Sequence, residues 1–239
     1  MRYTTRMATP DPLAALPQIE ALTRSERAYD ALESAIVHCQ LPPGTALSDR
    51  QLSEALGVSR TPIREAMHSL EAAGLVVRRG GRFVVAGFTT RDARELFELR
   101  RRLEPAGLEH LAESWDPAGV HELSTFFDEF PKHLPDGPYD EYLKRDHQFH
   151  KLIVEWSDNS RLVQFYEIVE KQINRIRHYL APGYRGRMEQ VVHEHQEICD
   201  AIARKDVESA RAALLSHLRK GEQAMIEYLA SQRNTEQSS

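Results

Sequence analysis

Residues 57–66 read GVSRTPIREA, and this stretch determines the fold of the first third of the chain. The pattern of a glycine that ends one helix, a short turn and a proline in the first turn of the next predicts two helices joined tightly. Either Thr61 or Ser59 could cap the second helix, with Pro62 in its first turn. Apolar residues at helical spacing follow, so the second helix has one face to bury. The stretch therefore predicts a helix-turn-helix.

The flanking sequence extends this unit in both directions. An amphipathic stretch at residues 29–40 predicts a helix before the motif, and a capping-box pattern at 48–51 begins the helix that precedes the turn. Runs of β-branched and aromatic residues on either side of Gly80 and Gly81 predict a β-hairpin. Three helices followed by a hairpin form a winged helix-turn-helix.

Arginines gather on the two elements with which a winged helix binds DNA. Residues 59–82 contain five arginines and two acidic residues, whereas the whole chain has a net charge of −5. Arg60 and Arg64 lie one turn apart at the start of the second helix of the motif, the end that enters the major groove. An arginine can pair with guanine, and hydroxyl groups suit phosphates. A solvated basic face is the alternative, but this clustering favours double-stranded DNA as a partner.

The rest of the chain has the hydrophobic period of α-helices. Residues that interrupt helices, such as proline and glycine, divide it into six expected helices, near residues 91–114, 117–133, 139–156, 160–181, 187–204 and 206–230. Pro105 falls inside the first and could kink it, and Thr90 is a plausible N-cap after the joint at 86–90. Such lengths are typical of an antiparallel helical bundle. The expected fold class is mainly α, a winged helix-turn-helix followed by an all-α bundle.

The ends of the chain and its composition set the domain limits and the compartment. We expect a disordered arm at 1–20, a DNA-binding domain at 21–88, a helical domain at 91–230 and a disordered tail at 231–239. Cys39 and Cys199 are far apart, which favours a reducing compartment. No signal peptide and no apolar run of about 18 residues or more is present, so a cytoplasmic protein without a membrane partner is expected.

Four polar side chains occupy the apolar stripes of expected helices: Asp146, His150, His195 and His217. Asp146 and His150 are four residues apart, so both project from one helix face. Burying an unpaired carboxylate costs several kcal/mol or more, so the bundle core needs something to satisfy these groups. Three imidazoles and a carboxylate suit a divalent metal, zinc first, with nickel, manganese or iron as alternatives. For any one histidine the alternative is a hydrogen-bonded core residue, but four together favour metal.

The stretch at 57–66, with residues 70–76 after it, resembles the signature of GntR-family bacterial transcriptional regulators over residues 24–88. The helical remainder resembles the metal-binding FCD effector domain of the FadR subfamily, through the four candidate ligands and the stretch 194–198. By position, the resemblance implies DNA contacts from Arg50, Ser59, Arg60, Thr61 and Arg64, with Gly80 and Gly81 at the wing tip. It also implies that Arg100 faces an effector cavity.

The candidate effector residues have alternatives. Arg100 could clamp the carboxylate of a small organic acid beside a metal, or form a salt bridge to an interior acid. Tyr142, Asn174 and Arg177 are further candidates for the cavity wall. For Arg50 the alternative to DNA is a surface ion pair with Glu54.

These observations predict a ligand-responsive transcriptional regulator, most simply a repressor, and not an enzyme. A homodimer is expected, because a helix-turn-helix dimer reads two halves of a near-palindromic operator. A metal-dependent hydrolase that uses the Asp and three His residues is the competing class, since such a site can activate water. A regulator with a purely structural metal is the third alternative.

Overall fold

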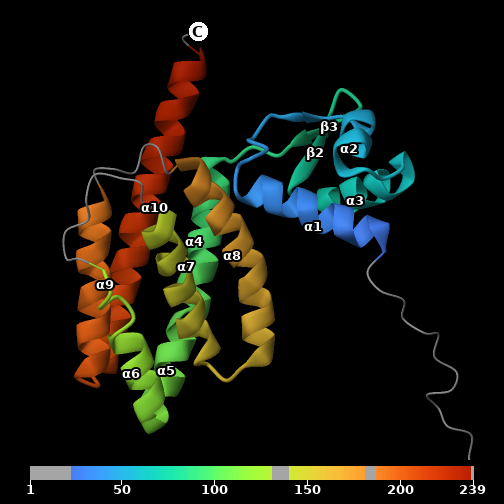
Figure 1. Cartoon of the computed structure of the whole chain (residues 1–239). Helices are drawn as coiled ribbons and strands as arrows, with labels where there is room; N and C mark the ends of the chain where they lie inside the picture. The colour runs from blue at the N-terminus through green and yellow to red at the C-terminus, as the bar shows by residue number, and fades with distance from the viewer. Residues whose placement is uncertain (1–22, 131–139, 181–186, 238–239) are drawn as a thin grey trace, which may run out of the picture.

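A computed structural model describes residues 23–130, 140–180 and 187–237, and it shows two units side by side (Figure 1). The amino-terminal unit holds three helices and a small sheet. These elements are α1 (Arg24–Val37), β1 (Ala46–Leu47), α2 (Asp49–Leu56), α3 (Arg60–Ala72), β2 (Val76–Arg79) and β3 (Arg82–Val85). The sheet is antiparallel with the strand order β1-β3-β2, and Arg79 pairs with Arg82 beside the hairpin turn. The predicted winged helix-turn-helix is confirmed, with one additional short strand.

Local sequence explains where these helices begin. Thr23 and Glu26 form a reciprocal capping box at the start of α1. Ser59, and not Thr61, occupies the N-cap position of α3, although its side chain makes no capping hydrogen bond. Gly57 ends α2 in the left-handed conformation, with φ of 65°, as the turn requires. The two helices of the motif are therefore joined by the turn that the glycine permits.

The second unit is wholly helical in the described residues. Its helices are α4 (Thr90–Leu103), α5 (Pro105–Ser114), α6 (Pro117–Ser124), α7 (Asp140–Glu155), α8 (Ser160–Leu180), α9 (Met188–Ala203) and α10 (Val207–Gln237). They lie roughly along one axis as a bundle, with α8 nearest to the winged helix (Figure 1). The prediction of an all-α bundle is confirmed.

Several expected boundaries were wrong. Pro105 does not kink one long helix but begins a new one, because proline lacks the N–H that would continue α4. Thr89 caps α4, and not Thr90. The second helix of the bundle ends at Ser124, well before residue 133. The last helix continues to Gln237, so most of the expected tail at 231–239 is helical, and the arm at 1–20 lies outside the described residues.

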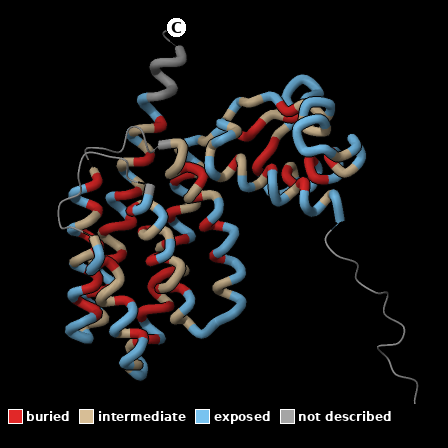
Figure 2. The backbone as a smooth tube through the Cα atoms, in the orientation of Figure 1, coloured by how far each residue is buried: buried red, intermediate tan, exposed pale blue. Residues whose placement is uncertain are grey.

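Buried residues line the interior of both units (Figure 2). The winged helix packs around Ile36, Ile63 and Met67, and the bundle has its own core around Phe149 and Ile198. Such separate cores are typical of two domains. Among the described residues, no helix is both long and apolar enough to cross a membrane.

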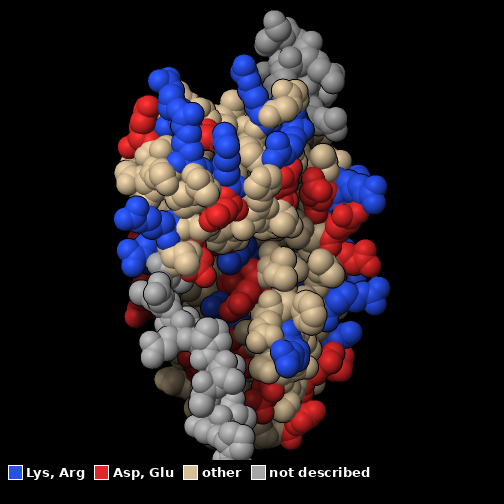
Figure 3. Space-filling model, turned by 90° about the vertical axis from the view of Figure 1, so that its right-hand side faces the viewer, with Lys and Arg blue, Asp and Glu red and all other residues tan. Residues whose placement is uncertain are grey.

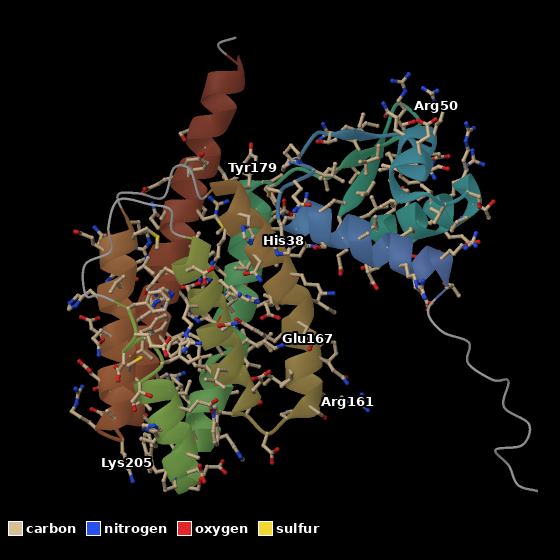
Figure 4. All side chains as sticks on the ribbon, in the orientation of Figure 1. His38, Arg50, Arg161, Glu167, Tyr179 and Lys205 are labelled. Carbon is tan, nitrogen blue, oxygen red and sulfur yellow. The ribbon has the colours of Figure 1, made fainter. Side chains whose placement is uncertain are left out.

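Helix α8 of the bundle packs against the winged helix. Its Lys171 pairs with Glu33 of α1 at 3.0 Å, and the rings of His38 and His178 lie 5.1 Å apart where α1 meets α8 (Figure 4). The buried Arg175 donates to the backbone carbonyl of Ala86, at the end of the wing, and lies 4.4 Å from the ring of Phe88. The position of the winged helix is therefore set by side chains of a bundle helix.

Candidate metal centre and nucleic-acid interface

The four candidate metal ligands meet in the middle of the bundle. Helix α7 supplies Asp146 and His150, α9 supplies His195 and α10 supplies His217, and one ligand atom from each lies within 4.8 Å of the others. All four are buried, with exposed fractions of 4% or less. The helical spacing of Asp146 and His150 brings both to one face, as the sequence predicts. The cluster thus has the composition of a divalent-metal site.

The Nδ1 atom of each histidine in the cluster contacts a side chain outside the cluster. His150 Nδ1 lies 2.8 Å from Glu104, and His217 Nδ1 lies 2.8 Å from Glu194. His195 Nδ1 lies 2.7 Å from the hydroxyl of Tyr142. These partners fix the orientation of the rings and leave the three Nε2 atoms to face one another, which is the arrangement that supports metal ligands in proteins.

The contacts at Nδ1 determine which ring nitrogen carries the proton. They therefore show whether the Nε2 atoms are free to bind a cation. A carboxylate only accepts hydrogen bonds, so His150 and His217 must carry their protons on Nδ1. Their two Nε2 atoms, 3.1 Å apart, then present lone pairs to each other. Asp146 Oδ1 adds a negative oxygen 3.1 Å from His195 Nε2. A cation bound among these atoms would satisfy all of them, so the residues fit a divalent metal.

Burial keeps the imidazoles of His150 and His217 in the neutral form that binds metal. It lowers the pKa of His150 to about 4, and burial together with the neighbouring His195 lowers the pKa of His217 to about 3. Burial alone would raise the pKa of Asp146, but Arg177 and the histidines hold it well below its usual range. At neutral pH the cluster therefore has two neutral imidazoles and an ionised carboxylate among its ligands.

A small cavity of about 30 Å³ lies beside the cluster. Its lining residues are Phe97, Arg100, Leu143, Asp146, Arg177, Arg187, Met188, Val191, His217 and Gly221. Arg100 and Arg177 of the expected effector residues thus border the cavity next to two candidate metal ligands. Tyr142 and Asn174 are not among the lining residues. Tyr142 supports His195, and Asn174 contacts His147 at 2.7 Å.

Of the two roles expected for Arg100, the structure shows the interior salt bridge. Arg100 donates from Nε to Glu104. Its exposed fraction is 1%, and neither Nη atom has a hydrogen-bond partner among the described residues. A fully buried guanidinium with free donors is costly unless an acceptor enters the site. Arg100 therefore borders the cavity and carries two Nη groups that have no partner among the described residues.

Sequence reasoning missed Glu104, a carboxylate that organises the site. Glu104 contacts Arg100, His150 and, at 2.8 Å, the hydroxyl of Tyr166. Although burial opposes its ionisation, Arg100 and His150 lower the pKa of Glu104 to about 2. The spacing of Arg100 and Glu104 by four residues could have indicated this pair. The contact with Tyr166 joins helices distant in sequence, so no local pattern reveals it.

The predicted DNA-binding residues all lie exposed on the winged helix. Arg50, Ser59, Arg60, Thr61 and Arg64 are on or next to α2 and α3, and Gly80 and Gly81 form the hairpin turn with positive φ. Basic side chains project at the upper end of this face (Figure 3), and Arg50 points outward (Figure 4). Arg64 pairs with Asp49 at 2.6 Å, and Arg50 lies 3.9 Å from Glu54, the alternative contact expected for it.

Comparison with known proteins assigns both domains. Residues 24–85 match the model of the gntR family of bacterial regulatory proteins, and residues 95–220 match the FCD domain. The chain belongs to the GntR family, with an FCD domain as its second unit. It is a DNA-binding transcriptional regulator of this type.

Relatives of known sequence and structure agree with the assignment. An uncharacterised helix-turn-helix transcriptional regulator of Bacillus subtilis, YdhC, is 31% identical over 79% of this chain and 85% of its own length. The Escherichia coli transcriptional repressor RspR is 25% identical over 82% of this chain and 86% of its own length. A Rhodococcus structure described as a GntR regulator has a TM-score of 0.70 and 24% identity, covers 85% of this chain and 98% of its own, and supports the fold alone.

Proposed function

We propose that this GntR regulator is a cytoplasmic, homodimeric repressor whose FCD domain holds a divalent metal and senses a small carboxylate. The observation that carries the proposal is the orientation of the three histidines. Each is fixed through Nδ1 so that its Nε2 faces Asp146 and the other two rings. The proposal places the protein in the FadR subfamily.

The residues that would hold the metal are Asp146, His150, His195 and His217. Zinc is favoured because imidazole and carboxylate ligands suit it, and nickel, manganese or iron would also be accommodated. Bound there, the metal would supply positive charge and open coordination positions for an anionic ligand. A metal that accepts more than four ligands would keep a position for such a ligand.

Arg100 would bind the carboxylate of the effector. Arg100 borders the same cavity as Asp146 and His217, and its Nη atoms have no partner among the described residues, so an acid there would contact the guanidinium and the metal site together. An arginine can form two parallel hydrogen bonds to a carboxylate. Glu104 positions this arginine through Nε and leaves the Nη atoms available.

Effector binding would reach the DNA-binding domain through α8 and α4. Helix α8 carries Arg177, which pairs with Asp146, and two residues earlier Arg175, which contacts Ala86 and Phe88. Helix α4 carries Arg100 and begins at Thr90, directly after the joint. Movement of either helix would therefore change the position of the winged helix and the spacing of the two recognition helices in a dimer.

A metal-dependent hydrolase is the less favoured alternative. Glu194, the acid next to His195 in sequence, contacts His217, Arg187 and Lys220 and so acts as a support. The exposed arginines of a winged helix have no use in a hydrolase. The name of the relative RspR supports repression, and no enzyme role is proposed.

A thermal-shift screen tests the proposed function. The full chain, loaded with zinc or stripped by a chelator, is heated with a panel of small carboxylic acids. We expect at least one acid to raise the melting temperature of the loaded protein, because a ligand that binds the folded state stabilises it. Arg100→Ala should abolish most of this rise. An acid that stabilises the stripped protein equally well would show that the metal is structural and that sensing occurs elsewhere.

A further inference from the structure

We propose that an exposed apolar patch on helices α4 and α8 is the surface through which two copies of this chain associate. The inference rests on the homodimer of the proposed function and names the contact that forms it. The patch consists of three large apolar side chains that stay exposed in the single chain, those of Leu99, Phe165 and Ile168, and is called the α4/α8 patch.

Most of the exposed large apolar side chains of the structure belong to this patch. Phe165 is 66% exposed, Ile168 64% and Leu99 46%. The fourth such side chain among the described residues is Leu56 of α2, at 36%. A single exposed leucine is ordinary on a protein surface, whereas neighbouring exposed apolar side chains mark a surface that another molecule covers.

Phe165 and Ile168 share one face of α8 with Gln172. Their spacing of three and then four residues places them in consecutive turns on the same side of the helix. Gln172 borders a groove to which Leu99 of α4 also contributes. The groove therefore connects the exposed face of α8 with the exposed leucine of α4.

The order of the contacts between α4 and α8 places Leu99 beside the same part of α8. Just before α4, the ring centre of Phe88 lies 4.4 Å from the guanidinium carbon of Arg175. At the end of α4, Glu104 accepts a hydrogen bond of 2.8 Å from the hydroxyl of Tyr166. The two helices therefore run in opposite directions, and Leu99 lies beside the segment of α8 that follows Tyr166.

The winged helix contacts α8 beyond the patch. Helix α8 begins at the end of the bundle far from the winged helix, near Arg161, and its first half extends past α1 (Figures 1 and 4). The ion pair with Glu33 and the hydrogen bond to the carbonyl of Ala73 come from Lys171 and Gln172. The patch residues of α8 precede both. Within the described residues, a second molecule can therefore reach the patch without displacing the winged helix.

The charges around the patch favour a second copy over DNA or an anionic membrane. Both helices carry exposed charges of both signs within one turn of the patch, three acidic and three basic in total: Glu95, Glu98, Glu167, Arg102, Arg161 and Lys171. DNA and anionic membranes attract surfaces with an excess of basic residues. An apolar centre with a rim of both signs can instead pair with itself, because a two-fold axis brings the same patch of each copy together.

An interface at the patch would lie on the helices that carry the proposed sensing residues. Leu99 and Arg100 are neighbours in α4, but Leu99 is 46% exposed and Arg100 only 1%, so the helix directs one to the surface and the other to the bundle interior. Helix α8 carries Arg177, which pairs with Asp146, beyond the patch. A shift of either helix would therefore change the contact between the two copies as well as the position of the winged helix.

Sedimentation of the full-length protein over a wide range of concentrations tests the patch. The wild-type chain should form a dimer. Phe165→Asp combined with Ile168→Asp should raise the dissociation constant of the dimer about thirtyfold or more, because charges replace the apolar centre of the interface. Leu99→Asp, on the other helix, should weaken the same dimer. Leu56→Asp places the same charge at an exposed leucine outside the patch, so this control should leave the dimer intact.

The outcomes separate the patch from the homodimer itself. A double variant that dimerises as tightly as the wild type would overturn the patch and leave a homodimer that forms through another face. A wild-type chain that is monomeric at every concentration would overturn both, and the patch would then belong to another protein or to a segment of the same chain. Circular dichroism and metal content show whether the variants keep their fold. If the double variant loses its helices, Phe165→Gln alone must weaken the dimer and keep them.

Discussion

The two domains use arginine in opposite ways. In the winged helix, Arg64 pairs with Asp49 while 63% of its side chain remains exposed. In the bundle, Arg100 pairs with Glu104 at exposed fractions of 1% and 0%. An exposed pair contributes about 0–1 kcal/mol and can exchange its carboxylate for a phosphate. A buried pair is costly to separate, so it responds only when another charged group enters its site. The first arrangement suits reversible DNA binding, and the second suits sensing.

Substitution of the candidate metal ligands should give the largest effect, a loss of bound metal. It tests the buried site of the bundle. His195→Ala and His217→Ala should each lose most of the bound metal after dialysis, because each deletes one of four ligands. His193→Ala should keep it, since His193 points to solvent and pairs with Glu197 at 3.3 Å. Elemental analysis measures the metal content. If the His193 variant lost metal and the His195 variant kept it, the metal would bind on the opposite face of α9 from the one proposed.

Among single substitutions that leave the four candidate metal ligands in place, Glu104→Gln should lower the free energy of unfolding most. It would leave Arg100 as an uncompensated buried charge and remove the acceptor for His150, and breaking a buried pair costs about 3–5 kcal/mol. Urea denaturation of the metal-stripped protein measures the loss. Glu109→Gln, which removes the acid of a surface pair with Arg211, is the control and should change stability by less than about 1 kcal/mol. Equal effects of the two changes would contradict the contrast between buried and exposed pairs.

Arg64→Ala should weaken specific DNA binding by about 1–3 kcal/mol and leave the fold intact. The exposed pair with Asp49 contributes little stability, so its loss is tolerated. Fluorescence anisotropy at fixed salt, with duplex DNA from upstream of the gene, measures the affinity. Arg91→Ala, an exposed arginine of α4, is the matched control. Unchanged affinity of the Arg64 variant would reject α3 as the recognition helix.

The pH dependence of stability should reveal the buried histidines of the metal-stripped protein. Burial lowers the pKa of His150 to about 4 and of His217 to about 3, from 6.5. The folded state then binds fewer protons, so the stability is complete above about pH 6.5 and falls as the pH decreases toward 4. Each histidine contributes a slope of about 1.4 kcal/mol per pH unit in this window. His217→Gln should remove the contribution of one histidine to this slope, and His193→Gln should remove none. Urea denaturation at several pH values measures the slopes, and equal slopes for the two variants would contradict a lowered pKa of His217.

The sequence revealed some of these features for a physical reason. A carboxylate or imidazole on an apolar helical stripe is conspicuous, so Asp146 and His217 could be found without a structure. The two-residue strand β1 is too short to form a pattern, and Pro105 in a continuous apolar period predicts a kink where the structure begins α5 as a separate helix. Supports such as Tyr142 for His195 join separate helices, and only packing brings them together. The clustering of arginines predicts DNA contact by Arg60 and Arg64, whereas the contacts assigned to Arg50, Ser59 and Thr61 depend on resemblance.

The measurement that tests the central claim most directly is the affinity of the full-length protein for its upstream DNA. It is measured by fluorescence anisotropy with and without the acid that the thermal-shift screen selects, on zinc-loaded and on metal-stripped protein. Because linkage is reciprocal, an acid that binds the free and DNA-bound forms differently must change DNA affinity, typically by about 5–150-fold. We predict a change of that size in the loaded protein and almost none in the stripped protein. An unchanged affinity in the loaded protein, or the same change in both, would contradict metal-dependent acid sensing.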